Sequence, residues 1–273
     1  MWKTKSTVRR VLYHTGAVLV SLVFAMPLIW LVSGSLRRAG LPPTAGAVWM
    51  SWPPAWENYG RIFELLPFGR YLLNSILIAV SGAGLTLLSA SLGGYGMSQL
   101  PRRVRRLLLA FSVALLIAPV TVLWLPRFLI FSRLGWIDSY AALLAPALMG
   151  TSPLFILLFY WTYRRIPGEQ FEAARMDGAG AFRTWWMVAL PQARPAVLAV
   201  GVLAFLSYWN DFLQPLLYLR SQKLYTLAIG LQQLQQMDRT NWPLMLAGGV
   251  VMTLPVMLVF WLSQRALLRE VAG

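Results

Sequence analysis

The sequence predicts an all-α membrane protein, a bundle of six transmembrane helices forming a single transmembrane domain over residues 1–273. The chain is 58% hydrophobic and only 12% charged, with a mean hydropathy of +0.60, and no soluble domain of this length needs so apolar a surface. Six stretches lack Lys and Arg for about 20 residues or more, the length that crosses the hydrocarbon core. Their backbone groups must be satisfied internally, which requires helices. We place the spans near 11–35, 71–97, 107–126, 139–163, 195–219 and 243–264.

Composition and charge exclude several classes of function. The net charge of +15 lies in short segments between apolar runs, so it suits anionic lipid headgroups and topology control rather than nucleic acid. The chain has no cysteine and one histidine, His14, which excludes thiol chemistry and a His-rich or Cys-based metal site within one chain. It contains no G-K-[ST], G-x-S-x-G or H-E-x-x-H pattern. We therefore expect neither an enzyme nor an ATP-binding chain.

The basic residues predict the orientation in the membrane. The basic N-terminus precedes an apolar run, as in a signal peptide, but no A-x-A-type cleavage site follows, which predicts a retained first span. With the N-terminus inside, most of the 24 Lys and Arg residues lie inside, within 3–10, 102–106, 164–194 and 265–269. The positive-inside rule then puts both termini in the cytoplasm.

The first external segment, 37–70, is too polar to span a membrane and is rich in proline and tryptophan. Residues Trp56–Phe68 could form a short interfacial helix with Tyr59, Phe63 and Leu66 on one side. The Pro and Trp residues are Pro42, Pro43, Trp49, Trp52, Pro53, Pro54 and Trp56.

Small residues and prolines mark the spans that follow. Small side chains at four-residue spacing let helices approach closely, which predicts packing within the chain for span two. They are Ser75, Ala79, Ala83, Ala90, Gly94 and Ser98. Prolines in spans three and four should break backbone hydrogen bonds locally, either as kinks that accommodate rocking or as packing irregularities. They are Pro119, Pro126, Pro146 and Pro153.

The most informative stretch is a polar loop at 164–195, which reads RRIPGEQFEAARMDGAGAFRTWWMVALPQARP between two apolar runs. Pro167 and Gly168 end the preceding segment, and Glu169 lies where the positive end of a helix dipole favours a carboxylate. Asp177-Gly178 is a turn signal. A second short helix is expected over about 181–189, carrying Phe182, Trp185 and Trp186.

The spacing of the polar loop resembles the "EAA loop" of ATP-binding-cassette (ABC) importer permeases. Glu172-Ala173-Ala174 is followed by Asp177-Gly178 and then by Val188-Ala189-Leu190-Pro191, where the family has E-A-A, G and I-x-L-P. The resemblance implies a coupling helix that docks in a groove of an ATPase subunit through Glu172, Ala173, Ala174, Asp177, Gly178, Leu190 and Pro191. Small Ala173 and Ala174 suit close contact, while Arg175 and Arg183 offer charge at the rim. The alternative is an ordinary amphipathic loop on the membrane surface.

Span five contains a second polar stretch, with Asp211 as the one acidic residue inside an expected span. A carboxylate there must face protein, water or the interface. In one interpretation an aromatic and polar set lines a solute path, because aromatic planes stack on sugar rings and polar groups bond hydroxyls. This set is Tyr208, Trp209, Asn210, Asp211 and Gln214. In the other, Asn210 and Asp211 hold a helix end or a helix contact.

Further patterns narrow the resemblance to the carbohydrate or maltose type of permease, in its second-permease (MalG-like) subfamily. They are W-N-D-F-x-x-P-L at 209–216 with Thr226, Leu227 and Gly230, and P…ENY…NS at Pro53, 57–59 and 74–75. The resemblance implies a type I importer permease fold in a bacterial or archaeal cell membrane, and a sugar or oligosaccharide as solute. It implies a second, distinct permease, two ATPase subunits that bind ATP and Mg, and an extracytoplasmic solute-binding protein. This chain itself would hold no cofactor.

Two other functions stay open at this stage. One is import of glycerol phosphate or a related polyol by the same kind of permease. The other is a stand-alone secondary transporter, which would favour embedded charge pairs or an internal repeat. The sequence shows one embedded acid and no clear repeat.

Overall fold

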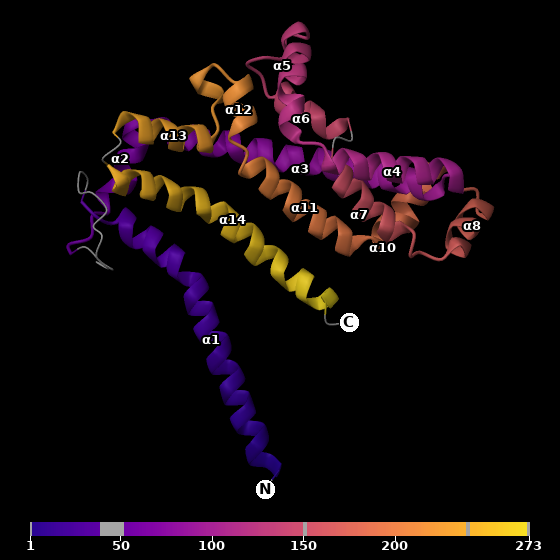
Figure 1. The fold of residues 1–273 in the computed structure, drawn as a ribbon, viewed down its shortest axis with the longest axis horizontal. Helices are drawn as coiled ribbons and strands as arrows, with labels where there is room; N and C mark the ends of the chain where they lie inside the picture. The colour runs from indigo at the N-terminus through magenta and orange to yellow at the C-terminus, as the bar shows by residue number, and fades with distance from the viewer. Residues whose placement is uncertain (1, 39–51, 150–151, 239–240, 272–273) are drawn as a thin grey trace. The chain divides into compact units, whose positions relative to one another are not determined.

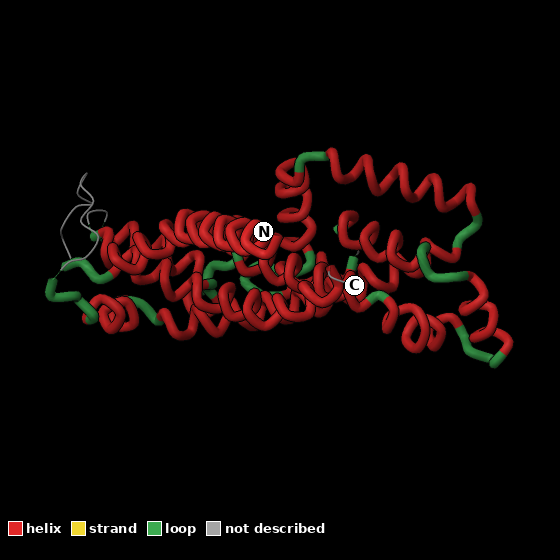
Figure 2. The backbone as a smooth tube through the Cα atoms, turned by 90° about the horizontal axis from the view of Figure 1, so that it is seen from below, coloured by secondary structure: helices red, strands yellow, loops and turns green. Residues whose placement is uncertain are grey.

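The computed structural model describes residues 2–38, 52–149, 152–238 and 241–271. All regular structure in these ranges is helical (Figures 1 and 2). Pro42, Pro43 and Trp49 of the expected external segment lie outside the described residues, as do positions 150–151 of the fourth expected span. The elements are α1 (Trp2–Ser35), α2 (Glu57–Leu65), α3 (Phe68–Gln99), α4 (Arg102–Ile117), η1 (Val120–Leu123), α5 (Trp124–Arg133), α6 (Ala141–Leu148), α7 (Pro153–Tyr163), α8 (Gly168–Met176), α9 (Ala181–Thr184), η2 (Trp185–Ala189), α10 (Leu190–Gln192), α11 (Arg194–Trp209), α12 (Leu213–Tyr218), η3 (Gln222–Leu224), α13 (Leu227–Met237) and α14 (Trp242–Val271).

The chain forms two compact units. Unit 1 comprises Met1–Phe68 and Leu231–Leu254, and unit 2 comprises Gly69–Gly230 and Pro255–Gly273. Within the described residues, four helices are long and apolar enough to cross a membrane, or up to six if each of two sharply bent pairs counts as one span. The membrane boundaries of the six expected spans stay predictions.

Unit 1 ties α2 to the end of α1 through buried polar contacts. The Asn58 side-chain amide donates to the backbone carbonyls of Ser35, at 2.8 Å, and Arg37, at 2.6 Å. The Tyr59 and Ser35 hydroxyls are 2.7 Å apart. The short helix expected from the sequence therefore exists as α2, and the Glu57-Asn58-Tyr59 pattern has a structural role in it. This helix buries Asn58 and Ile62, whereas Phe63 stays exposed.

Unit 2 is built along the long helix α3. The small residues expected to pack within the chain are all buried. At Gly94 a methyl group would lie 2.8 Å from the backbone nitrogen of Tyr160 and 2.9 Å from the carbonyl oxygen of Ile156, so α3 and α7 are in backbone contact there. Asn74 donates to the carbonyls of Lys223 and Tyr225. These contacts confirm the prediction of close packing and give part of the P…ENY…NS pattern a structural role.

Two helices of unit 2 break, one near a proline and one at a polar pair that the sequence offered as a possible helix end. Helix α4 ends at Ile117, two residues before Pro119, and the chain turns by 94° into Val120–Arg133. Proline lacks the backbone donor that would continue the helix, so this break is the one its position predicts. Helix α11 ends at Trp209, and the expected span 195–219 continues only as the short helix α12. The break expected at Pro153 is also observed, because this residue is the first of α7.

Candidate functional site

The polar loop folds as two short helical segments joined by a turn. Helix α8 ends in a Schellman motif, in which the Gly178 backbone nitrogen donates to the Arg175 carbonyl at 3.0 Å and the Ala179 nitrogen to the Ala174 carbonyl at 2.9 Å. Gly178 has φ +78°, a conformation that side chains with a Cβ rarely adopt. The Asp177-Gly178 signal thus becomes the cap that ends α8.

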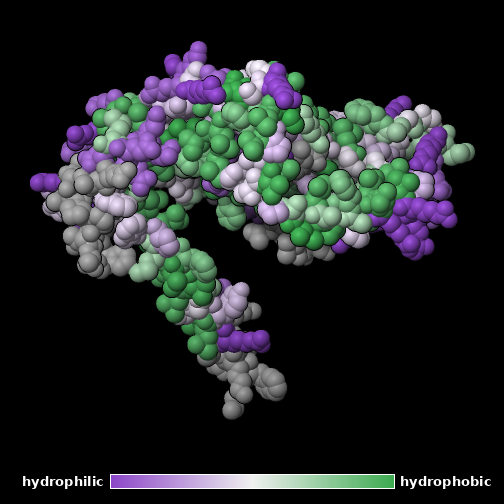
Figure 3. Space-filling view, turned by 45° about the horizontal axis from the view of Figure 1, so that its top comes forward, coloured by the Kyte–Doolittle hydropathy of each residue, from purple (hydrophilic) through white to green (hydrophobic). Residues whose placement is uncertain are grey.

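The residues expected to dock lie mostly on the outer side of this loop. Phe171 is buried, and its ring lies 6.0 Å from the Tyr95 ring of α3. Helix α8 therefore has one anchored face and one open face. The exposed members of the predicted docking set are Glu172, Ala173, Asp177, Gly178 and Pro191, while Ala174 and Leu190 are half-buried. Hydrophilic side chains gather over the end of unit 2 where α8 lies (Figure 3).

The structure also exposes apolar side chains here that the motif did not indicate. Met176 is 88% exposed, and Phe182, Trp186 and Met187 are more than half exposed. Methionine and aromatic side chains are enriched at protein interfaces. The sequence analysis placed Phe182, Trp185 and Trp186 together on one short helix. Of these three, only Trp185 is buried, with 2% of its surface exposed. The run of large apolar residues within this charged loop was the sequence signal that could have predicted an exposed apolar surface.

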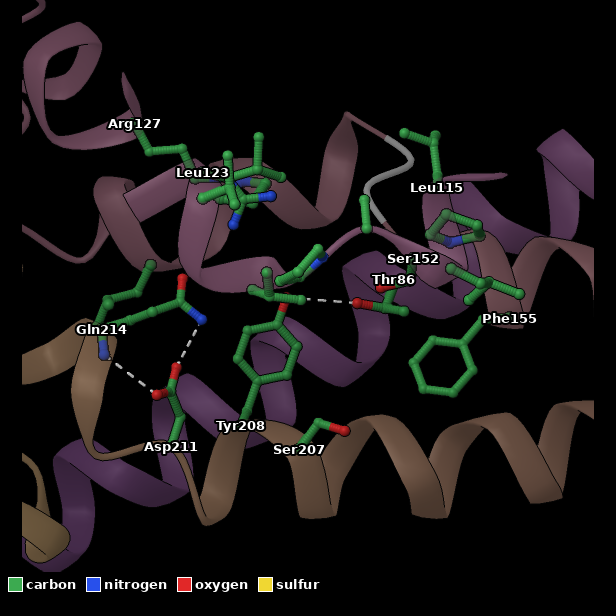
Figure 4. A pocket seen from close by; sticks show the side chains of 18 residues that line it. Thr86, Leu115, Leu123, Arg127, Ser152, Phe155, Ser207, Tyr208, Asp211 and Gln214 are labelled. Carbon is green, nitrogen blue, oxygen red and sulfur yellow. Dashed lines mark hydrogen bonds between the residues drawn. The ribbon is translucent and has the colours of Figure 1, made fainter. Parts of the chain in front are cut away.

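A cavity of about 760 Å³ lies in unit 2 where the broken helices meet (Figure 4). Three prolines line it: Pro119 follows the end of α4, Pro153 begins α7, and Pro146 lies within α6. Its volume is within the range of small-molecule sites, roughly 300–1,000 Å³. Its polar lining consists of Thr86, Arg127, Ser152, Ser207, Tyr208, Asp211 and Gln214.

The cavity brings together some of the span-five residues singled out in the sequence. Tyr208, Asp211 and Gln214 line it. Trp209 is buried, with its ring stacked on that of Phe205 at 5.7 Å, and does not line it. Asn210 is exposed and is also absent from the lining. Arg127 was not foreseen, because it lies in α5, beyond the end of the expected third span.

Asp211 both faces the cavity and holds the start of α12. Its carboxylate accepts the backbone N–H of Gln214 at 3.2 Å and the Gln214 side-chain amide at 2.8 Å (Figure 4). A carboxylate at a helix N-terminus satisfies a donor that lacks an intrahelical partner. The two interpretations of this residue are therefore compatible.

Tyr208 is held against α3. A methyl group at Gly82 would lie 2.7 Å from three atoms of the Tyr208 ring, so only a glycine leaves room for the ring there. The Tyr208 and Thr86 hydroxyls are 3.4 Å apart, a long separation for a hydrogen bond (Figure 4). Shape rather than hydrogen bonding positions this ring at the cavity wall.

Asp138 joins two segments of unit 2 outside the expected spans. Its carboxylate accepts the backbone N–H of Arg220 at 2.9 Å and of Ser221 at 2.8 Å, and also the Ser221 hydroxyl. These bonds, the Ser221 hydroxyl first, hold the pKa of Asp138 below its ordinary value of 3.8. Sequence patterns did not indicate this contact, since the partners lie 82 and 83 residues away.

A helical fold with a cavity between broken apolar helices, and an exposed loop with a buried anchor, are features expected of a membrane transport permease. The chain belongs to the family described as binding-protein-dependent transport system inner membrane component, whose model matches residues 82–273.

Relatives and a solved structure agree with this family. The arabinooligosaccharides transport system permease protein AraQ of Bacillus subtilis is 29% identical, covering 91% of this chain and 89% of its own. The trehalose/maltose transport system permease protein MalG of Thermococcus litoralis is 28% identical, covering 96% and 94%. The crystal structure of a bacterial ABC transporter that imports the acidic polysaccharide alginate superposes with a TM-score of 0.74 at 25% identity, covering 94% of this chain and 96% of that one.

These findings confirm the predicted class. The chain is an inner-membrane permease of an ABC importer, it has the all-α fold expected from its resemblance, and it is a transport protein rather than an enzyme. This family membership argues against the alternative of a stand-alone secondary transporter.

Proposed function

We propose that this chain forms half of the translocation path of a sugar or oligosaccharide importer, and that the polar loop couples it to an ATPase subunit. The observation that carries the coupling role is the two-sided structure of the loop. Phe171 and Trp185 anchor it in unit 2, while most of the docking set is exposed. A rigidly anchored segment with an exposed, partly apolar face can transmit a displacement that a free loop would absorb.

The exposed face also suits a protein partner chemically. Small Ala173 and Gly178 permit close approach, and exposed Met176 and Phe182 offer apolar contact area. Arg175 and Arg183, on either side, can pair with acidic groups of a partner. ATP and Mg would be bound by two copies of the partner ATPase and not by this chain.

The solute class follows from the relatives and from the cavity. AraQ and MalG are named for oligosaccharide and disaccharide transport. An aromatic ring at Tyr208 beside the polar groups of Asp211 and Gln214 is the combination that sugar rings and hydroxyls need. We infer that Tyr208, Asp211 and Gln214 contact the solute and that the buried Trp209 supports the helix that carries them. Asn210 of the predicted path is exposed outside the lining, and we do not assign it a contact with the solute.

A glycerol phosphate or related polyol is the second candidate solute. Arg127 brings a guanidinium to the cavity wall, and a guanidinium is well suited to phosphate oxygens. Uptake of labelled maltose, arabinotriose and glycerol 3-phosphate by the complete transporter in vesicles separates the two. Transport of the sugars alone supports the first solute class, and transport of glycerol 3-phosphate alone overturns it.

The assembly and orientation complete the proposal. We propose a distinct second permease, an extracytoplasmic solute-binding protein that delivers the solute, and cytoplasmic N- and C-termini. In this orientation the polar loop faces the cytoplasm, where an ATPase subunit is found. Proteolysis of a terminal tag in right-side-out vesicles tests the orientation, since cleavage from outside would contradict it.

The coupling role is tested by mild-detergent purification of this chain from its native membranes, with mass spectrometry of the proteins that accompany it. We expect an ATPase subunit and a second six-span chain. The same purification with Gly178→Arg should lose the ATPase and keep the second permease, because the large side chain lies at the docking face and the residue must leave φ +78°. Retention of the ATPase by this variant would contradict docking through the loop.

A further inference from the structure

Helix α3 contacts the polar loop along one stripe of its surface. Ser91, Tyr95 and Gln99 are four residues apart and so lie on the same face of the helix. The Trp185 indole N–H donates to the Ser91 hydroxyl at 2.9 Å, and the Arg175 guanidinium donates to the Gln99 side-chain oxygen at 2.8 Å. Tyr95 contributes the ring contact to the loop described above. Both helical segments of the loop are therefore attached to α3.

The strongest of these attachments is a buried hydrogen-bonded cluster. Ser91 and Tyr163 are each 1% exposed, and their hydroxyls are 2.6 Å apart. Together with Trp185 they join α3, the end of α7 and the loop. Buried polar groups that satisfy one another define a single geometry, whereas an exposed contact such as Arg175–Gln99 contributes little.

The backbone of the loop is unusual where it enters this cluster. Trp185 is the first residue of η2, a π-helical turn over Trp185–Ala189. Such turns are rare and are found frequently at functional sites. Here Trp185 is buried in the cluster, while its neighbours Phe182 and Trp186 remain exposed on the loop.

Helix α3 also reaches the cavity, through residues N-terminal to Ser91. Gly82 underlies the Tyr208 ring, and Thr86 is a buried residue of the cavity lining. Ser91 is five residues from Thr86, about 7.5 Å along a helix. Because α3 is continuous from Phe68 to Gln99, a displacement at Ser91 moves the surface against which Tyr208 rests.

We propose that α3 is the mechanical link between the polar loop and the cavity, and that Ser91, Tyr163 and Trp185 are the positioning residues that fasten the loop to it. Movement of the loop by the ATPase is transmitted through this cluster to Gly82 and Thr86, which reshapes the cavity at Tyr208. This inference rests on the coupling role proposed above.

The test uses the absence of cysteine from this chain. Ser207→Cys places one thiol in the cavity lining, at an exposed position. The complete transporter is reconstituted in vesicles, and labelling of this thiol by a membrane-impermeant maleimide is followed with and without Mg-ATP and vanadate. Mass spectrometry of this chain distinguishes its label from that of other subunits. Without further changes, ATP should alter the labelling rate by about fivefold or more, a typical coupling between two sites.

Trp185→Phe and Tyr163→Phe keep an aromatic ring but remove the polar atoms of the cluster. With either change we expect the ATP-dependent difference in labelling rate to fall below about twofold while ATP hydrolysis persists. Adding Ser91→Ala to Trp185→Phe should cause little further loss, since residues of one network are not additive. Thr162→Val is the matched control, because the Thr162 hydroxyl donates within its own helix, to the Leu158 carbonyl at 2.8 Å.

An undiminished response to ATP in both Trp185→Phe and Tyr163→Phe would overturn the link. A response lost equally in Thr162→Val would do the same, since the effect would then not be specific to the cluster. Failure of the coupling role itself gives a different result. In that case the ATPase does not co-purify with the unmodified chain, or the thiol in the unmodified background does not respond to ATP.

Discussion

The polar loop and the cavity were both indicated by the sequence, but to different degrees. The loop follows from local signals, since its helix, its turn and its second segment are continuous in the chain and Gly178 supplies the cap that ends the first helix. The cavity combines residues from Thr86 to Gln214, and only part of the expected path reaches it. A contiguous motif therefore specifies its own geometry, whereas the shape of a cavity depends on how distant helices pack.

The largest expected effect is at the glycine turn that ends α8. Gly178→Arg should abolish transport while membrane insertion persists, since φ +78° strains any side chain and the new side chain blocks the docking face. The measurement is solute uptake together with the amount of chain in the membrane. Gly180→Ala is the control, because Gly180 has φ −66° and a methyl group there meets nothing within 4 Å. Normal uptake by the arginine variant would refute the importance of this turn.

The next prediction concerns shape at the cavity wall. Gly82→Ala puts a methyl group against the Tyr208 ring, and overpacking costs about 1–3 kcal/mol, so we expect uptake to fall about tenfold. Gly84→Ala makes the same chemical change two residues on, where a methyl group meets no atom within 4 Å, and should leave uptake within about twofold. Equal uptake in the two variants would show that the position of Tyr208 does not matter.

A smaller effect tests the two roles of Asp211. Asp211→Asn keeps a side-chain oxygen that can accept the Gln214 backbone N–H but removes the charge, whereas Asp211→Ala removes both. We expect uptake to fall about twofold for the first and about fivefold for the second, since one hydrogen bond to an otherwise unpaired helix N–H contributes about 1 kcal/mol. Asn210→Ala, outside the cavity lining, should match the wild type. An equally strong effect of Asn210→Ala would restore that residue to the path.

The smallest effect concerns the junction at Asp138. Since the folded pKa of this carboxyl lies below its ordinary value of 3.8, its contribution to stability is present above about pH 4 and is lost as the pH falls through the folded pKa. Asp138→Asn should therefore lower the melting temperature of the purified chain at pH 7, and the difference from wild type should shrink toward pH 3. A difference independent of pH would contradict the role of the charge.

The sequence predicted the fold class and two of the four helix breaks expected at prolines for local reasons, whereas Pro126 and Pro146 lie within α5 and α6. The length and hydropathy of the apolar runs follow from the thickness of the bilayer, and Pro119 and Pro153 mark helix ends because proline removes a backbone donor. A helix end at Asn210 and Asp211 was one of two interpretations, and α11 does end at Trp209; the sequence did not decide between the two because no proline or glycine stands there. It also did not separate the buried Trp185 from the exposed Phe182 and Trp186, since adjacent aromatics give no signal of which one packs inward.

By itself the sequence determined that this chain is a helical membrane permease with a capped polar loop. Hydropathy, turn residues and motif spacing act within about 30 residues of chain, so they can be read without a fold. Only the tertiary structure decided which groups meet across the bundle. The Ser91–Tyr163 and Ser91–Trp185 hydrogen bonds join residues 72 and 94 positions apart, and the cavity exists only where broken helices fail to fill the space between them. Such contacts depend on helix packing, in which close approach at positions such as Gly82 and Gly94 sets the distance.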